Sequence, residues 1–276
     1  MTKKSTLFGA SIVAFVIFGL SGCGDDAANQ QALATANLAR DVQEIQNLMG
    51  RRAFYHSAGR NDLEFELYAK SVDDISWGQN QGFWVGHDII KKHYVTEHTE
   101  SMESDLARMT KLYPELANDP KNLNAGSFVI HSLSTPIIEV AGDGKTAKGV
   151  WYTPGAIGMT DAKGKLNGSW LWERYAVDFI KEDGQWKFWH IMVLTDFMAS
   201  MDTGFSGTPT EAPIGKENAQ DDQAAQPAAG GAAPFDIVVE NYKSWSPVVT
   251  QAIAPRLPEP YQTFSETFSY GPPAAQ

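Results

Sequence analysis

The chain has 276 residues, of which 43% are hydrophobic and 11% aromatic, which suffices for one domain with a substantial core. Its formal net charge of −11 argues against nucleic acid and against an anionic membrane surface as partners. Cys23 is the only cysteine, so the domain that follows it has no disulfide, no thiolate metal site and no thiol nucleophile.

Residues 1–22 predict a secretory signal peptide. A basic start precedes an apolar run from Leu7 to Leu20, whose 14 residues are too few to span a membrane as a helix. The run ends at Leu20-Ser21-Gly22-Cys23, which resembles the lipobox of bacterial lipoproteins. This resemblance implies lipidation of Cys23 and a place in the cell envelope, at the outer membrane facing the periplasm, with the membrane contacted only through the lipid anchor. An ordinary signal peptide with a chance cysteine is the alternative.

Helices are expected next. Residues 23–36 are small and polar and predict a tether. A helix that ends at Gly59 is predicted from residues at three- and four-residue spacing, namely Leu38, Val42, Ile45, Leu48, Met49, Arg52, Tyr55 and His56. The pattern then predicts a short helix over residues 63–68 capped by Asp62, a short strand over 74–78, a hairpin over 82–86, a helix from His87 and a charged, partly helical insertion over 100–118.

Strands follow the helices. Alternating side chains predict strands over residues 128–140, 146–152, 170–181 and 185–194, with turns at Gly142-Asp143-Gly144 and Glu182-Asp183-Gly184. Helices followed by an antiparallel meander indicate the α+β class. Residues 201–233 are rich in Ala, Pro, Gly and Gln and predict a disordered linker. Residues 234–276 regain apolar side chains but carry many prolines, which predicts an extended tail that packs on the domain or on a partner subunit of a homo-oligomer.

The segments 175–179 and 181–188 resemble the last hairpin of SnoaL-like proteins, which share the fold of nuclear transport factor two, ketosteroid isomerase and scytalone dehydratase. Residues 59–63 and 84–90 match two further parts of that family, and the resemblance covers a domain over residues 37–200. It implies a cone-shaped, curved antiparallel sheet wrapped around an N-terminal helix, a cystatin-like α+β barrel with the ligand inside. Because this fold hosts dehydratases, isomerases, cyclases, lyases and mere binders, it does not fix the reaction.

Two strand histidines are candidate acids or bases. On the last strand Lys187 should face water, which places Trp186, Phe188, His190, Met192 and Leu194 inside the cone. His131 has the offset from its strand end that the resemblance assigns to a catalytic histidine of scytalone dehydratase. The second histidine of that enzyme would fall near Ile157, so His190 is the expected substitute. A hydrogen-bonded core histidine and a strand-edge histidine are the respective alternatives.

Helix and sheet also offer polar side chains to the cone. Tyr55 could donate a hydrogen bond to a developing charge, and His56 could move a proton, although His56 also suits a helix C-terminus. Strand parity places Tyr175 and Glu173 inside, with Arg52 as the expected partner of the carboxylate.

These residues predict an enzyme that performs acid–base elimination or isomerisation, as a lyase, dehydratase or isomerase, on a small aromatic or polycyclic molecule. The expected catalytic residues are His131, His190, Tyr175, Tyr55 and His56. The expected substrate-binding residues are Trp151, Trp84, Trp172, Phe188, Met192, Arg52 and Glu173, although most tryptophans are simply core. The histidine spacing and the lack of a phosphate-binding loop argue against a metal or nucleotide cofactor. A non-catalytic binding or scaffold lipoprotein is the alternative.

Overall fold

The computed structural model describes residues 23–206, 235–238 and 242–266. The predicted signal peptide, residues 207–233 of the predicted linker and residues 267–276 of the predicted tail lie outside the described residues. The chain divides into two units, residues 1–37 and residues 38–276.

The described part of the first unit belongs to helix α1 (Cys23–Ser57). Residues 26–37 are helical and exposed to solvent, although their composition predicted a tether and the helical pattern began at Leu38, which is itself exposed. The reason is composition: this stretch is rich in alanine and glutamine, two good helix formers, and from residue 25 onward it contains neither glycine nor proline.

The second unit contains the remainder of α1 and all other elements. The helices are α2 (Asn61–Phe65), α3 (His87–Ile90), a π-helical turn (Lys91–Thr96), α4 (Glu97–Leu112) and 3₁₀ turns at Pro114–Leu116, Pro120–Asn122 and Gly204–Ser206. The strands are β1 (Ser76–Gln79), β2 (Gly82–Val85), β3 (Ser127–His131), β4 (Ser134–Val140), β5 (Thr146–Thr160), β6 (Leu166–Glu182), β7 (Gln185–Ser200) and β8 (Ile237–Val238).

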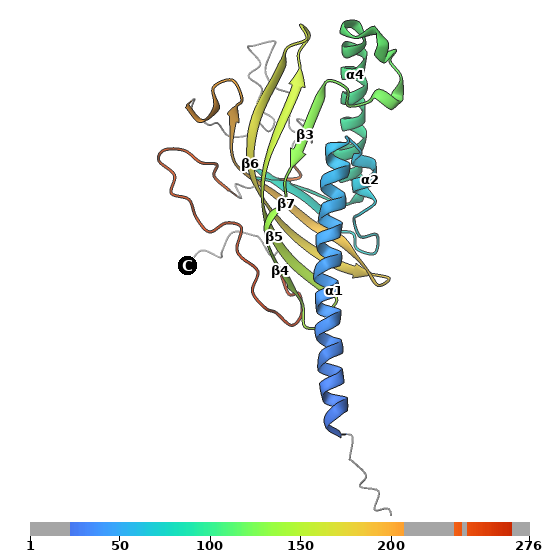
Figure 1. Ribbon diagram of the computed structural model, residues 1–276, viewed down its shortest axis with the longest axis vertical. Helices are drawn as coiled ribbons and strands as arrows, with labels where there is room; N and C mark the ends of the chain where they lie inside the picture. Colours follow the sequence, from blue (N-terminus) through green and yellow to red (C-terminus); the bar gives the residue numbers. More distant parts are fainter. Residues whose placement is uncertain (1–22, 207–234, 239–241, 267–276) are drawn as a thin grey trace, which may run out of the picture. The chain divides into compact units, whose positions relative to one another are not determined.

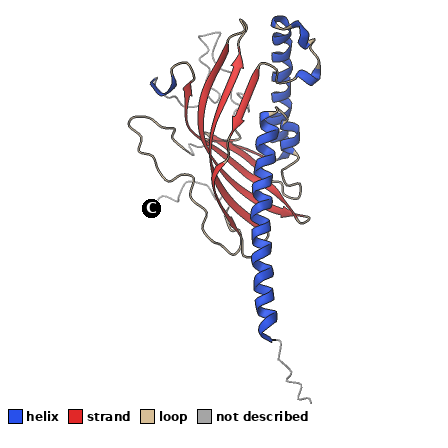
Figure 2. Cartoon of the chain, in the orientation of Figure 1, coloured by secondary structure: helices blue, strands red, loops and turns tan. Residues whose placement is uncertain are grey.

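The strands form one curved, open sheet in the order β3-β5-β6-β7-β1-β2-β8, and β4 also pairs with β5. Neighbouring strands are antiparallel except β1 and β7, which run parallel. Within this unit α1, α2 and α4 lie on one side of the sheet (Figures 1 and 2). The predicted α+β class, with a curved antiparallel sheet around an N-terminal helix, is confirmed.

Two local boundaries differ from expectation. The predicted strand over residues 128–140 is broken into β3 and β4, which pair with successive parts of β5. The cap of the short helix is Arg60 rather than Asp62. Asp62 lies inside α2, where it accepts two hydrogen bonds of 2.8 and 2.7 Å from the Arg60 guanidinium.

Helix α1 is fixed to the sheet by apolar packing and by one buried carboxylate. Ile45 and Met49 are almost fully buried in the core cluster that joins α1 to the inner face of the sheet. One turn earlier, Asp41 accepts hydrogen bonds from Lys181 Nζ at 2.6 Å and from Trp186 Nε1 at 3.1 Å. These contacts therefore fix the position of α1 along its own axis relative to the β6–β7 hairpin.

Strand β7 carries two one-residue bulges that decide which side chains face α1. Asp178 pairs with His190 but Phe179 pairs with Phe188, so Trp189 is an extra residue. A second shift leaves Asp196 extra between the partners of β6. One extra residue reverses the alternation of a strand. Side chains after Trp189 therefore face the opposite side of the sheet from the one that an unbroken alternation from Phe188 predicts.

The described part of the C-terminal tail lies on the outer face of the sheet, opposite α1. The backbone amide of Trp245 donates to the Asp196 carbonyl at 2.7 Å, and the Arg174 guanidinium donates to the carbonyls of Ala252 and Ala254. Tyr242 packs on the outer apolar cluster, which consists of Phe83, Val150, Ala176, Met192 and Leu194.

A chain that ends at Ala233 should lose this cover. We expect its melting temperature to fall by about 4–8 °C, which corresponds to roughly 2 kcal/mol of lost burial and hydrogen bonding. Binding of the dye ANS should rise, because Met192 and Leu194 become exposed. Differential scanning fluorimetry and dye titration of both chains measure these effects. An identical melting curve with unchanged dye fluorescence would show that the tail contributes nothing to the fold.

Candidate active site

A small cavity opens on the inner face of the sheet, between α1 and the strands. Its volume is about 30 Å³, which is room for water but less than a typical ligand pocket. Its walls are Arg52, His56, Trp77, Gln79, Val129, His131, Ile157, Leu171, Glu173, Tyr175 and Val193. Apolar walls with a few convergent polar groups are typical of a small-molecule site.

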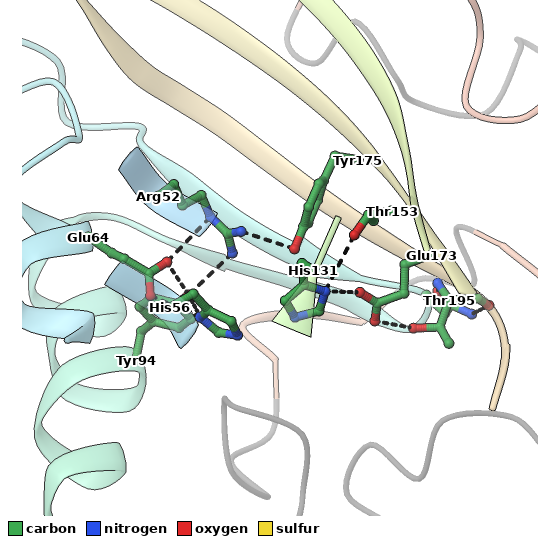
Figure 3. A network of polar contacts seen from close by, with 10 residues as sticks. Arg52, His56, Glu64, Tyr94, His131, Thr153, Glu173, Tyr175 and Thr195 are labelled. Atoms are coloured by element: carbon green, nitrogen blue, oxygen red, sulfur yellow. Dashed lines mark hydrogen bonds and ion pairs between the residues drawn. The ribbon is translucent and has the colours of Figure 1, made fainter. Parts of the chain in front are cut away.

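One side of the cavity is formed by a buried charge cluster at the end of α1 (Figure 3). Glu64 lies 3.4 Å from Arg52 Nε and accepts a hydrogen bond from His56 Nδ1 at 2.9 Å. The Tyr94 hydroxyl donates to the same carboxylate at 2.8 Å. Arg52 also donates to the hydroxyls of Tyr175, at 3.0 Å, and of Tyr94, at 3.2 Å.

Local structure explains how this cluster forms. Arg52 and His56 are four residues apart on α1 and therefore project from the same face. Gly59 then reverses the chain with a φ of +66°, and a side chain there would meet Met102, so that α2 can bring Glu64 back against them. Tyr94 comes from the π-helical turn, a feature that often occurs at functional sites.

The other side of the cavity is formed by a second imidazole and its carboxylate. His131 Nδ1 on β3 lies 3.2 Å from Glu173 Oε2 on β6. The other carboxylate oxygen, Oε1, accepts a hydrogen bond from the Thr195 hydroxyl at 3.0 Å. The hydrogen bond from Thr195 fixes the orientation of Glu173, and Oε2 is left at ion-pair distance from His131 without a hydrogen bond among the described residues.

The two imidazoles face each other, with ring centroids of His56 and His131 5.0 Å apart (Figure 3). Each uses Nδ1 toward its own buried carboxylate. Within the part of the chain that the structure describes, neither Nε2 forms a hydrogen bond. A proton on Nδ1 leaves a lone pair on Nε2, so each histidine can act as a base toward a bound molecule.

The electrostatic environment sets the protonation of these groups. Burial lowers the pKa of the His131 imidazole, although Glu173 acts in the opposite direction. Burial alone would raise the pKa of Glu64, but the nearby His56 and Arg52 and the hydrogen bonds from His56 and Tyr94 hold that pKa below its usual value. Burial raises the pKa of Tyr175 to about 12. Near neutral pH, Glu64 is ionised, His131 is neutral and Tyr175 keeps its proton.

His190 is not in this cavity, contrary to the expectation from strand alternation. The bulge at Trp189 turns His190 to the outer face, where its Nδ1 lies 2.8 Å from Asp178 and its ring lies against Trp189. Regular alternation predicts the wrong face for His190 because the bulge at Trp189 interrupts the strand. Phe188, which precedes the bulge, keeps the predicted inward direction.

The predicted aromatic walls are also elsewhere. Trp151 and Phe188 are buried in the main core, and Trp84 stacks on Trp77 in the same core. Trp172 and Met192 lie on the outer face, Trp172 against Phe197 and Phe205. Tyr55 is half-buried on α1 and does not line the cavity.

Five of the predicted site residues line the cavity, namely Arg52, His56, His131, Glu173 and Tyr175. The expected pair between Glu173 and Arg52 is wrong, since Glu173 lies by His131 and Arg52 has Glu64.

Sequence reasoning missed Glu64, Tyr94, Trp77 and Thr195. Glu64 lies among other charged residues in the sequence, so its burial could not be predicted from hydropathy. Its position shortly after the predicted turn at Gly59 did indicate that it could fold back against the end of the first helix. Ile157, where the resemblance would place a second histidine, lines the cavity, and His56 supplies the second imidazole from α1 instead.

Within residues 23–206, 235–238 and 242–266, no three His, Cys, Asp or Glu side chains gather so that they could hold a metal ion. Among the described helices, none combines the length and the apolar composition that crossing a membrane requires.

The buried cluster should make Glu64 important for stability. The substitution Glu64→Gln leaves the buried Arg52 without its carboxylate, so we expect the free energy of unfolding to fall by about 3 kcal/mol. The matched control is Glu66→Gln, two residues away, where an exposed carboxylate pairs with Lys70 and the expected change is within about 0.5 kcal/mol. Urea denaturation measures both. Equal, small effects of the two substitutions would contradict the cluster.

Comparison with solved structures finds similar chains at low sequence identity. A provisionally assigned scytalone dehydratase from Novosphingobium aromaticivorans is 16% identical, over 60% of this chain and 90% of that one, with a TM-score of 0.42. An NTF2-like protein with a cystatin-like fold from the same organism is 16% identical, over 64% and 92%, with a TM-score of 0.37. The type 3 LinA hexachlorocyclohexane dehydrochlorinase from Novosphingobium barchaimii is 14% identical, over 60% and 92%, with a TM-score of 0.39.

No curated protein matches the sequence. The sequence model of the SnoaL-like domain matches residues 37–192, which is more than half of the chain. These residues run from α1, which carries His56, to the middle of β7. The hairpin and turn motifs predicted the same family. The fold shared by this family hosts dehydratases and isomerases. The protein is a member of the SnoaL-like domain family.

Proposed function

We propose that this protein catalyses an acid–base elimination or isomerisation of a small organic molecule in the cavity between α1 and the sheet. The observation that supports this most is the pair of facing imidazoles, His56 and His131, each held through Nδ1 by its own buried carboxylate. A pocket that only binds needs no such pair, because two costly buried carboxylates add little to the affinity for an apolar molecule.

His131 is the proposed general base. Its lowered pKa keeps the imidazole neutral near pH 7, so its Nε2 can take a proton from carbon next to a carbonyl group. Glu173 does not touch the substrate in this scheme. It orients the ring and stabilises the imidazolium that forms, as a carboxylate behind a catalytic histidine does.

Arg52 and Tyr175 are the proposed stabilisers of the negative charge that develops on the carbonyl oxygen. The Tyr175 hydroxyl accepts a hydrogen bond from Arg52 and, among the described residues, donates to none. Its proton is therefore available to a ligand oxygen, and the guanidinium behind it makes the hydroxyl a stronger donor.

His56 is the proposed acid. In an elimination, the electron pair released when His131 removes the proton forms the new double bond, and the leaving group departs with a proton from the His56 imidazolium. The Glu64 carboxylate, 2.9 Å from His56 Nδ1, orients the ring that delivers this proton. In an isomerisation, His131 returns the proton to a second carbon and His56 is not consumed.

The shape of the cavity bears on the substrate. Its free volume of about 30 Å³ is too small for the polycyclic molecule expected from the sequence. Val129 belongs to β3, which lies at the edge of the sheet and, among the described strands, pairs with β5 alone. Such an edge can shift to admit a somewhat larger molecule. A small hydroxyketone or hydroxy-aldehyde, with an acidic C–H and a leaving hydroxyl, fits these groups.

Proton exchange tests this proposal without knowledge of the natural substrate. Small ketones and hydroxyketones are incubated with the protein in D₂O, and loss of the C–H signal is followed by NMR. We expect catalysed exchange for at least one compound, reduced at least about 100-fold by His131→Asn, which keeps an amide near Glu173 but removes the base. His87→Asn, outside the cavity, should exchange normally. Saturable quenching of tryptophan fluorescence without any exchange would instead indicate a binding protein.

We further propose that the protein is a lipoprotein of the cell envelope, anchored through Cys23. The support is the sequence Leu20-Ser21-Gly22-Cys23 at the end of an apolar run. The long exposed start of α1 after Cys23 agrees with a spacer between anchor and domain.

Cys23→Ser should abolish processing and acylation. Mass spectrometry of the wild-type N-terminus should find fatty acyl groups, and the variant should leave the detergent-extracted membrane fraction because its thiol acceptor is gone. Ser21→Ala, in the same motif, is the control and should fractionate like the wild type. A wild-type N-terminus without acyl groups would refute the anchor.

A further inference from the structure

The C-terminal tail reaches the sheet at the place where β7 supports the cavity. Tyr242, Ser244 and Trp245 lie on the second bulge of β7, the one at Asp196. The Tyr242 hydroxyl donates to the Asp196 carboxylate, which also binds Arg174 at 3.0 Å. The tail is therefore attached to this bulge by several polar contacts.

Ser244 is the most deeply placed of these residues, with 3% of its surface exposed. Its hydroxyl donates to the carbonyl of Thr195 at 2.9 Å and accepts from the Asn80 side chain at 3.0 Å. The same Asn80 amide binds Thr195 twice, accepting from its backbone N–H at 2.8 Å and donating to its carbonyl at 3.0 Å. The backbone of Thr195 is thus clamped by two side chains, one of them from the tail.

The side chain of Thr195 passes to the inner face and ends on the active site. Thr195 is fully buried, and its hydroxyl donates to Glu173 at 3.0 Å. Glu173 in turn lies against His131. A continuous chain of contacts therefore runs from the tail to the proposed base, through Ser244, Thr195, Glu173 and His131.

We propose that Ser244 is a positioning residue of the active site: the tail clamps Thr195 at the bulge, and Thr195 holds the Glu173 carboxylate in place behind His131. This inference rests on the role proposed for His131 and gives the tail a part in the site as well as in the cover of the sheet. Asp196, the residue after Thr195, has no partner in the β6–β7 ladder, so the side chains of Asn80 and Ser244 supply additional contacts that fix the backbone of Thr195 beside this bulge. Through these contacts the tail also influences the base. If the Glu173 carboxylate loses the hydrogen bond from Thr195, it attracts the proton of the His131 imidazole more strongly.

The test is the titration of the coupled Glu173–His131 pair, followed by NMR of protein with labelled histidine, with His131 assigned by comparison with His131→Asn. Thr195→Val removes the hydroxyl at nearly constant shape, so the apparent pKa of the pair should rise by about one unit. Thr195→Ser should restore the wild-type titration. Ser244→Ala should shift the titration in the same direction by a smaller amount. Ser246→Ala, the same substitution two residues along the tail at a half-buried position, is the matched control and should change nothing.

The readout does not require turnover, so it is independent of the reaction proposed above. A shift in Thr195→Val together with an unchanged titration in Ser244→Ala would overturn the role of the tail. Unchanged titrations in both would overturn the whole chain of contacts. Melting curves of the folded variants accompany the titrations, and if Thr195→Val does not fold, Ser244→Ala against Ser246→Ala decides alone.

Discussion

The register of β7 against β6 determines most of what this protein presents to a ligand. Two extra residues, Trp189 and Asp196, reverse the alternation of the strand twice. Between them, Val193 and Thr195 face the cavity side, whereas His190 and Met192 face outward. A strand without these bulges would place a different set of side chains around α1. The composition of the site is therefore determined first by the register of β7.

The site combines two buried carboxylates, one guanidinium and two imidazoles. Removing such charges from water is costly, and each carboxylate is stabilised by close donors: Glu64 by Arg52 and His56, Glu173 by Thr195 beside His131. A core built for stability alone would be as stable with apolar side chains. The burial of charged groups on two sides of one small cavity therefore favours a role in chemistry over a role in packing alone.

The sequence predicted the order of elements, the α+β class and the family, because periodicity and turn residues report local structure directly. It also predicted that His56, His131, Glu173 and Tyr175 face inward, since these lie on a regular helix or on strands with unbroken alternation toward the site. It failed for His190 because a bulge has no signature in alternation. It failed for Glu64 and Thr195 because their roles arise from contacts between segments far apart in the chain.

The contact of Asp41 with the β6–β7 hairpin has a mechanical consequence. Lys181 and Trp186 hold α1 eleven residues before Arg52 and fifteen before His56. A force applied to the helix just before Asp41 would act on these two contacts before it acted on the turn that carries His56. These two contacts therefore help to keep the distance between the imidazoles of His56 and His131 constant if the residues before Asp41 move.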